Sequence, residues 1–227
     1  IWIITGPISS GEYELNDVGT KIVSTPGNKI GSSISCSGDL DGDGDDDLAI
    51  GAIEYDGARG ATYIVYSPAS AGSLEGSVIL TGEEPGDLAG SGVDITSDQN
   101  NDGIDDLVIG AYGEDSTAEG AGAVYVVYGP ASSMSLTSAD AKLTGEAFAD
   151  LAGLALAQAG DLNGDSYGDF LVGAFEADSG SGGGEGSAYV LLGPPVSGSL
   201  GDHTKVTGIN SGDNAGYALA GGCDVNG

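Results

Sequence analysis

The sequence predicts an all-β protein, specifically a β-propeller of four-stranded antiparallel blades. First, an aspartate-rich loop recurs along the chain, starting at Asp39, Asp98 and Asp161 with spacings of 59 and 63 residues (98 − 39 and 161 − 98). Second, short apolar runs bounded by turn residues flank each loop and indicate strands. Third, glycine makes up 43 of 227 residues while 40% are hydrophobic, which indicates turns and tight packing in a folded β protein rather than disorder.

The repeat divides the chain into units that form a single domain or a fragment of one. We expect about three and three-quarter repeats: a partial opening unit at 1–28, full units at 29–88, 89–151 and 152–214, and a partial unit at 215–227. Radial four-stranded units with hairpin connections are propeller blades. A β-solenoid is the structural alternative, but its repeats are usually shorter.

Each full unit is expected to contain four strands. The first precedes the aspartate loop, the second follows it, the third is an aromatic or apolar run, and the fourth ends the unit. The predicted strands, in that order, are Ile34–Ser37, Val93–Thr96, Leu154–Ala157 and Ala218–Gly221 for the first; Leu48–Gly51, Leu107–Gly110 and Phe170–Gly173 for the second; Ala61–Tyr66, Ala123–Tyr128 and Ala188–Leu192 for the third; and Val78–Thr81, Ala141–Thr144 and Thr204–Thr207 for the fourth.

The two ends of the chain fit the same register. Ile1–Ile4 matches the third strands and Lys21–Ser24 the fourth, so the sequence opens in mid-unit. Ala147–Ala157 has helical propensity in isolation. It aligns, however, with Pro85–Ile95 of the preceding repeat, which contains glycines and strand-forming residues. Equivalent repeats share a fold, so we predict a loop followed by a strand there.

The first loop, residues 39–47, has the composition of a calcium site. Aspartates stand at positions 1, 3, 5 and 9, and Gly44 at position 6 permits the turn that brings them together. Ca²⁺ takes six to eight oxygen ligands in a tolerant geometry, which this spacing supplies. The alternative is a solvated acidic turn. The predicted ligands are the side chains of Asp39, Asp41, Asp43 and Asp47 with the carbonyl of Asp45.

Recurrence of the same offsets favours calcium over a solvated turn. The second loop offers the side chains of Asp98, Asn100, Asp102 and Asp106 with the carbonyl of Ile104. The third loop offers the side chains of Asp161, Asn163, Asp165 and Asp169 with the carbonyl of Tyr167. Asp224 and Asn226 begin a fourth, truncated copy. Because Ser166 replaces the glycine at position 6, we expect the third loop to bind calcium most weakly of the three complete sites.

The flanking residues exclude an EF-hand. An EF-hand carries a bidentate glutamate at position 12 and helices on both sides. Position 12 here is Ile50, Ile109 or Val172, each within a predicted strand. The ion is therefore expected in a strand-to-strand loop. Calcium affinities of such sites favour a secreted or cell-surface location.

Charge and composition exclude several functions. The formal net charge of −30 argues against nucleic acid and anionic membranes as partners. No run of 18 apolar residues is present, so we expect no membrane insertion. His203 is the single histidine, which leaves no histidine-based triad or zinc site, and the well-spaced carboxylates are assigned to calcium. We therefore predict that the chain is not an enzyme.

The motifs resemble the FG-GAP repeat of integrin alpha-subunit propellers, in which a Phe-Gly element precedes the calcium loop and a Gly-Ala-Pro element follows it. The Gly-Ala element stands here as Gly51-Ala52, Gly110-Ala111 and Gly173-Ala174, followed by Ile53, Tyr112 and Phe175 in place of proline. The Phe-Gly element appears as Ile30-Gly31, Ala89-Gly90, Ala152-Gly153 and Ala215-Gly216, without the aromatic ring. The resemblance implies an extracellular calcium-binding propeller, usually of seven blades.

Three functions follow as hypotheses. The favoured one is an extracellular adhesion or structural surface module, with a protein or glycan ligand on a cell surface or matrix. The alternatives are a carbohydrate-binding, lectin-like propeller and a non-catalytic accessory domain of a secreted hydrolase. Open blade edges also invite self-assembly.

The two cysteines test ring size. In the repeat register, Cys36 and Cys223 fall in the segment that runs from a first strand into a calcium loop. A closed four-bladed ring would bring them near disulfide distance, whereas a seven-bladed ring would keep them apart. We expect a larger ring or an assembled fragment rather than the four-bladed ring.

Overall fold

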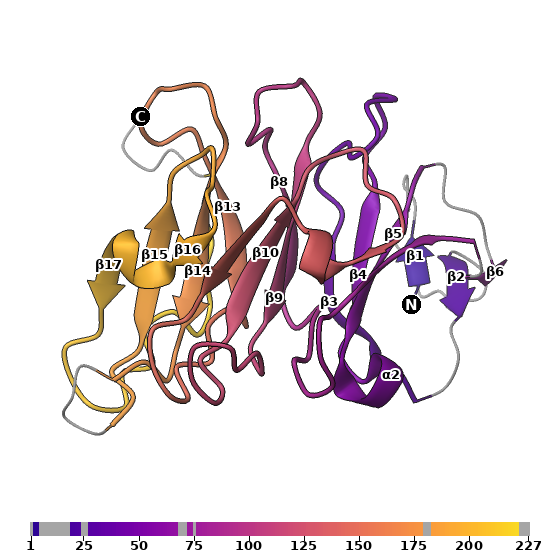
Figure 1. Cartoon of the computed structure of the whole chain (residues 1–227). Coiled ribbons are helices and arrows are strands. Elements are labelled where there is room, and N and C mark those ends of the chain that lie inside the picture. Colours follow the sequence, from indigo (N-terminus) through magenta and orange to yellow (C-terminus); the bar gives the residue numbers. More distant parts are fainter. Residues whose placement is uncertain are drawn as a thin grey trace, which may run out of the picture.

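The protein is an all-β array of sheets that stand side by side (Figure 1). The computed structural model describes residues 2–4, 19–23, 27–67, 72–74, 76–178 and 183–222. Helical structure within these ranges is confined to a four-residue turn, α2 (Tyr55–Ala58), and two 3₁₀ turns at Leu136–Ser138 and Leu200–Asp202. None of the helices in these ranges is long and apolar enough to cross a membrane.

Each repeat unit contributes one sheet, and the strands follow the predicted order. The opening unit supplies β1 (Trp2–Ile4) and β2 (Gly19–Val23). The full units supply, in turn, β3 (Ile30–Ser35), β4 (Leu48–Ala52), β5 (Ala61–Val65) and β7 (Val78–Thr81); β8 (Val93–Thr96), β9 (Asp106–Ala111), β10 (Ala123–Val127) and β12 (Ala141–Thr144); and β13 (Leu156–Gly160), β14 (Asp169–Ala174), β15 (Ser187–Leu191) and β17 (Thr204–Thr207).

Neighbouring strands within each unit are antiparallel, as expected for propeller blades. The predicted loop followed by a strand at Ala147–Ala157 is confirmed, because β13 starts only at Leu156. Two first strands are displaced from their predicted bounds: β3 starts earlier, at Ile30, and β13 starts later.

The prediction of a strand at Ala218–Gly221 is wrong, because these residues form no strand. In the full units the first strand pairs with the second strand of its own unit, as β8 does with β9. No counterpart of that second strand exists among the residues that the structure describes beyond Gly221. Pairing with a neighbouring strand, rather than local propensity, decides whether a short strand forms.

Three two-residue strands join adjacent units, and the sequence patterns did not predict them. They are β6 (Gly72–Ser73), β11 (Met134–Ser135) and β16 (Gly198–Ser199), here called the linking strands. Each lies between the third and fourth strands of its own unit, yet pairs in parallel with the fourth strand of the preceding unit: β6 with β2, β11 with β7, and β16 with β12. The linking strands therefore tie each sheet to its neighbour.

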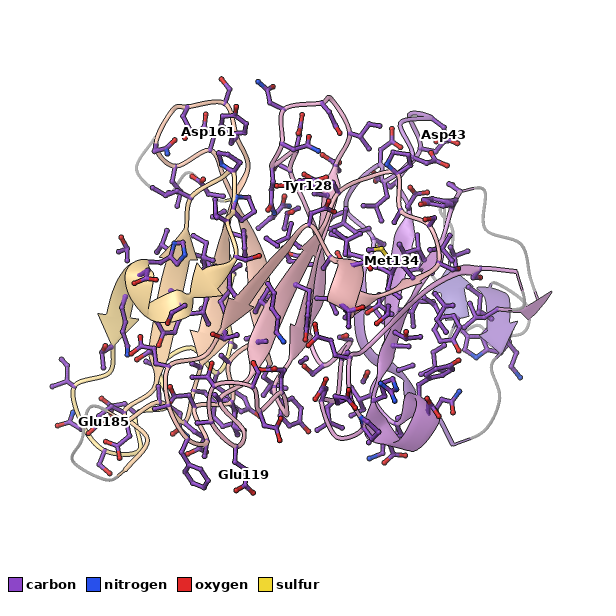
Figure 2. All side chains as sticks on the ribbon, in the orientation of Figure 1. Asp43, Glu119, Tyr128, Met134, Asp161 and Glu185 are labelled. Carbon is purple, nitrogen blue, oxygen red and sulfur yellow. The ribbon has the colours of Figure 1, made fainter. Side chains whose placement is uncertain are left out.

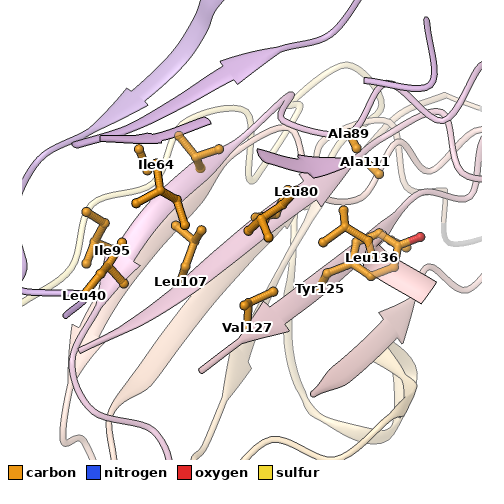
Figure 3. Close-up of a cluster of buried hydrophobic side chains, with 14 residues drawn as sticks. Leu40, Ile64, Leu80, Ala89, Ile95, Leu107, Ala111, Tyr125, Val127 and Leu136 are labelled. Carbon is orange, nitrogen blue, oxygen red and sulfur yellow. The ribbon is translucent and has the colours of Figure 1, made fainter. Parts of the chain in front are cut away.

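The hydrophobic core consists of layers between the sheets rather than one central cluster. Between the first and second full units, Leu40, Ile64 and Leu80 from one side pack with Ile95, Leu107 and Tyr125 from the other (Figure 3). The junction between the second and third full units repeats the pattern with Val124, Leu143, Phe170, Val172 and Tyr189. Each sheet therefore depends on its neighbours for burial of both faces.

Paired glycines allow the sheets to approach closely at these junctions. Gly110 on β9 faces Gly153 of the next unit, and a Cβ added to Gly110 would overlap the carbonyl oxygen of Gly153. The same approach joins Gly51 to Gly90 and Gly173 to Gly216. The N–H of Gly153 is bonded within its own unit, to the carbonyl of Gly173 at 3.0 Å, which holds Gly153 at the junction. Only glycine fits at these positions.

Candidate calcium loops

The three predicted loops lie at one end of the array, each between the first and second strands of its unit. Figure 2 shows Asp43 of the first loop and Asp161 of the third at this end, with Glu119 and Glu185 at the opposite end. Each loop is a hairpin connection between antiparallel neighbours, β3–β4, β8–β9 and β13–β14. The strands thus present all three loops in the same direction.

The aspartate at position 1 organises the first loop by accepting backbone hydrogen bonds. Asp39 Oδ1 accepts from the N–H groups of Gly42 and Asp43 at 2.7 and 3.1 Å, and its Oδ2 accepts from that of Gly44 at 2.8 Å. Asp41 Oδ1 accepts from the N–H of Asp43 at 3.2 Å. The backbone is therefore wrapped around the side chain at position 1, which turns the odd-numbered side chains inward.

The same bonds recur in the other two loops. Asp98 accepts from Asn101, Asp102 and Gly103, and Asp161 accepts from Gly164, Asp165 and Ser166, each set at positions 4, 5 and 6. In each loop the residue at position 7 donates its N–H to the side chain at position 5, from Asp45, Ile104 and Tyr167 to Asp43, Asp102 and Asp165 at 2.9–3.0 Å. The loops are thus three copies of one conformation.

This conformation needs a left-handed backbone at position 6. Gly44 and Gly103 have φ of 95° and 91°, and a Cβ added to either would have no other group within 4 Å. Ser166 occupies the same position in the third loop with φ of 75°. A non-glycine residue in this region is strained by roughly 1–2 kcal/mol. The strain supports the expectation that the third loop binds calcium most weakly.

The aspartate at position 9 is held differently from the others. Three buried aspartates occupy this position: Asp47, Asp106 and Asp169. In each, both carboxylate oxygens accept a hydrogen bond from a backbone N–H group. One oxygen accepts from the N–H at position 2, as in Asp106 with Gln99 at 2.6 Å. The other accepts from the N–H two residues after the third strand, as in Asp106 with Gly129 at 3.0 Å. These carboxylates fasten the loop to the end of the third strand, a contact that sequence spacing did not reveal. Each oxygen keeps a second lone pair for a cation.

The loops are also bonded to one another. The N–H of Asp105 in the second loop donates to the carbonyl of Asp39 in the first at 3.1 Å. The N–H of Gly168 in the third donates to the carbonyl of Asp98 in the second at 2.7 Å. The N–H of Asp39 also donates to Asp105 Oδ2 at 3.0 Å. Asp105, which the sequence pattern did not single out, therefore bridges two loops.

Electrostatics separates the exposed and buried aspartates. At Asp39, partial desolvation is outweighed by the N–H groups of Gly44, Gly42 and Asp43, which together hold the pKa below its usual value. At Asp161, the N–H of Ser166 is the main cause of a lowered pKa. Burial acts in the other direction at Asp106 and raises its pKa to about 7. Backbone N–H groups thus favour the anionic form of Asp39 and Asp161, whereas Asp106 is an anion only at the cost of desolvation.

The residues present fit a calcium ion. Carboxylate oxygens of Asp39, Asp41 and Asp43 lie within 4.8 Å of one another, close enough to share one cation. In the second and third loops an asparagine replaces the second aspartate, and Asn100 and Asn163 lie within hydrogen-bond distance of Asp102 and Asp165 at 2.9 and 2.8 Å. The predicted fourth copy at Asp224 and Asn226 lies outside the described residues, as does Cys223.

The comparison with known families agrees with this geometry. The family model described as FG-GAP repeat matches residues 32–66 and 89–127, which cover the first and second loops with the strands around them. The chain contains FG-GAP repeats. Their two glycine elements are the residues that meet at the unit junctions: Gly51 and Gly110 of the Gly-Ala elements face Gly90 and Gly153 of the following unit.

The curated relatives that this FG-GAP chain matches include integrin alpha subunits. It is 33% identical over 205 residues to integrin alpha-PS2 of Drosophila melanogaster, which covers 84% of this chain and 14% of the relative. It is 33% identical to integrin alpha-3 of Cricetulus griseus, over 73% of this chain and 15% of the relative. It is 34% identical to integrin alpha-7 of Rattus norvegicus, over 74% of this chain and 14% of the relative. The chain spans about one seventh of the length of these relatives.

Proposed function

We propose that this chain is a calcium-binding β-propeller module that serves adhesion, or forms a structural surface, outside the cell or at its surface. Three Ca²⁺ ions are held by residues 39–47, 98–106 and 161–169. The observation that carries the proposal is the shared loop conformation, in which the backbone wraps around position 1 and three carboxylates of the first loop converge. Convergence of oxygen donors without nitrogen or sulfur matches the preference of Ca²⁺.

The ligand set of each site follows from this conformation. The side chains at positions 1, 3 and 5 face the ion, and the carbonyl at position 7 joins them, which is Asp45, Ile104 or Tyr167. The buried aspartate at position 9 adds the oxygen lone pairs that its two backbone hydrogen bonds leave available. Since the same aspartate is bonded to the end of the third strand, an ion bound there would stiffen the blade as well as the loop.

Calcium has a further structural role at this end of the array. The chain has a formal net charge of −30, and like charges within one loop repel at short range. Because adjacent loops share backbone hydrogen bonds through Asp39, Asp98 and their partners, repulsion in one loop is transmitted to the next. Three ions would neutralise the most crowded carboxylates and hold three units in one arrangement.

The adhesion role rests on the relatives. All those named above are integrin alpha subunits, so a protein ligand is the favoured partner. A glycan ligand is the alternative. Binding of the calcium-loaded chain to immobilised extracellular-matrix proteins, unaffected by free sugars, would support adhesion through protein. Inhibition of that binding by a simple sugar would instead favour the lectin-like role.

Calcium removal tests the metal sites directly. We expect calorimetry to show three ions per chain, and a chelator to lower the melting temperature, because each site contributes about 2.7 kcal/mol at free calcium one hundred times its dissociation constant. Asp43→Ala should remove one ion. Asp46→Ala is the matched control: it deletes an exposed carboxylate of the same loop that is not among the predicted ligands, and it should keep three. An unchanged melting curve in excess chelator would refute the metal sites.

A further inference from the structure

The three loops differ at positions 3 and 4 in their covalent chemistry as well as in charge. Each loop has its own pair of residues there: Asp41-Gly42, Asn100-Asn101 and Asn163-Gly164. Among these loops the third alone has an asparagine followed by a glycine. Asparagine is a chemically labile residue, and glycine after it removes the Cβ that would hinder attack on the side-chain amide. The third loop therefore carries a reactive bond inside its predicted ligand set.

The reaction of such a pair is deamidation through a cyclic imide. The backbone nitrogen of Gly164 attacks Cγ of Asn163, so that an N–Cγ bond forms and the Cγ–Nδ2 bond breaks. The amide nitrogen leaves as ammonia and takes the proton of the attacking N–H group. Water then opens the ring at one of its two carbonyls. One product is aspartate, and the other is isoaspartate, in which the main chain runs through the former side chain.

Position 4 of the loop is accessible to this reaction in the folded chain. Gly164 has a left-handed backbone with φ of 78°, and a Cβ added to it would meet no other group within 4 Å. Gly164 is exposed, and so are Gly42 and Asn101, whose loops are each followed by another unit. Exposure of position 4 is therefore a property of the loop rather than of its place in the chain.

Hydrogen bonds of the loop place the reacting groups. The N–H of Gly164 donates to Asp161 Oδ1 at 2.7 Å, so a carboxylate already lies at the proton that must leave. Asn163 is held by Asp165, whose N–H donates to Asn163 Oδ1 at 2.9 Å and whose Oδ2 accepts from Asn163 Nδ2 at 2.8 Å. Such exposed bonds contribute little net free energy and release the side chain readily. A cation bound to Asn163 Oδ1 would instead hold Cγ in place.

We propose that Asn163-Gly164 is a self-modifying site whose deamidation is suppressed by calcium in the third loop. The inference rests on the calcium site proposed above, in which Asn163 is a ligand. The aspartate product would give the third loop the four carboxylate side chains of the first and bind the ion more tightly, since affinity follows ligand charge. The isoaspartate product lengthens the main chain between positions 3 and 4. It therefore displaces the N–H groups of Gly164, Asp165 and Ser166 from Asp161 and abolishes the site.

Mass spectrometry of peptides from the aged full-length chain tests the modification. We expect Asn163 to gain the mass of an amide-to-acid conversion in chelator. Because only the ion-free loop reacts, free calcium at one hundred times the dissociation constant should slow the reaction about one hundredfold. Asn100 is the control within the same chain and should react far more slowly, because the side chain of Asn101 hinders the attack. Asn101→Gly should make Asn100 reactive in chelator, and its φ of 62° already suits glycine.

Removal of the third ion alone separates protection by calcium from the stability of the whole chain. Asp165→Ala deletes a predicted ligand of the third loop while the other two loops keep theirs. Asn163 should then react as fast in calcium as in chelator. Asp102→Ala makes the same change in the second loop and is the matched control, so Asn163 should stay protected by calcium in that variant. Equal protection in both variants would overturn the proposal.

Calorimetry distinguishes this inference from the calcium site on which it rests. A fresh chain should bind three ions, a chain converted to isoaspartate at position 163 should bind two, and Asn163→Asp should bind three with the third held more tightly. If the fresh chain binds three ions but Asn163 stays intact in chelator, or reacts equally with and without calcium, the inference fails and the site stands. If the fresh chain binds no ion in the third loop, both fail.

Discussion

The second full unit (89–151) and the third (152–214) follow the same plan but differ in how their outer strands are covered. On β12 buried and half-buried residues alternate, and β16 lies along its edge. On β17 every residue is exposed. The candidate calcium loops also differ in burial: at position 2, Gln99 is 0% exposed and Leu162 is 58% exposed. The chemistry of a unit is thus set by its own residues, whereas its burial is set by the unit beside it.

The lysine on the fourth strand of each unit shows how this difference in burial affects the strength of ion pairs. Lys142 lies over the Tyr125 ring at 5.4 Å and pairs with Glu83 and Glu114 at 2.5 and 2.9 Å. Lys205 lies over the Tyr189 ring at 5.3 Å and pairs with Glu146 at 3.1 Å. Glu114 is nearly buried, whereas Glu146 is one-third exposed. Removal of one partner from a buried pair leaves an uncompensated charge, while exposed pairs contribute little.

The largest effect is expected at the junction that joins the two units. Gly110→Ala would push a methyl group into the Gly153 carbonyl, so the sheets must separate, and we expect the free energy of unfolding to fall by about 3 kcal/mol or more. Gly198→Ala is the control, because the nearest atom to its added carbon is 3.9 Å away, and its effect should stay within about 0.5 kcal/mol. Denaturant unfolding measures both. Equal effects would mean that the units are not in such close contact.

A smaller contrast is expected between the two lysines. Lys142→Met keeps the side-chain length but leaves Glu83 and Glu114 facing each other, which should cost about 2 kcal/mol of stability. Lys205→Met removes a more exposed pair and should cost less than about 1 kcal/mol. Thermal unfolding of the two variants at low and high salt measures the difference. Identical losses would show that burial by the neighbouring unit does not set the strength of these pairs.

The strands and the loops could be predicted from sequence because both are local patterns. Short apolar runs bounded by turn residues mark β9 and β10, and alternate oxygen-bearing residues mark each loop. The linking strands were missed because two residues carry no periodicity. A signal was nonetheless present, since Ser-Leu recurs at Ser73-Leu74, Ser135-Leu136 and Ser199-Leu200.

The second bond of each position-9 aspartate could not have been predicted either. Asp47 meets the N–H of Ser67, 20 residues away, and Asp106 meets that of Gly129, 23 residues away. Such contacts depend on how far the third strand runs before it turns, which the register between strands decides. The wrongly predicted strand at Ala218–Gly221 has the same origin, because pairing rather than propensity decides whether a short strand forms.

The smallest expected effect separates the third loop from the second. Ser166 holds a left-handed backbone that Gly103 adopts without strain in the second loop. Ser166→Gly should therefore stabilise the protein by about 1 kcal/mol, which corresponds to a rise of about 2–4 °C in melting temperature for a chain of this size. Ser166→Ala is the control, because it removes the same hydroxyl but keeps the strain. If glycine and alanine behave alike, the backbone at position 6 does not distinguish the loops. With the strain relieved, calorimetry should also show the third loop binding calcium more tightly, close to the second.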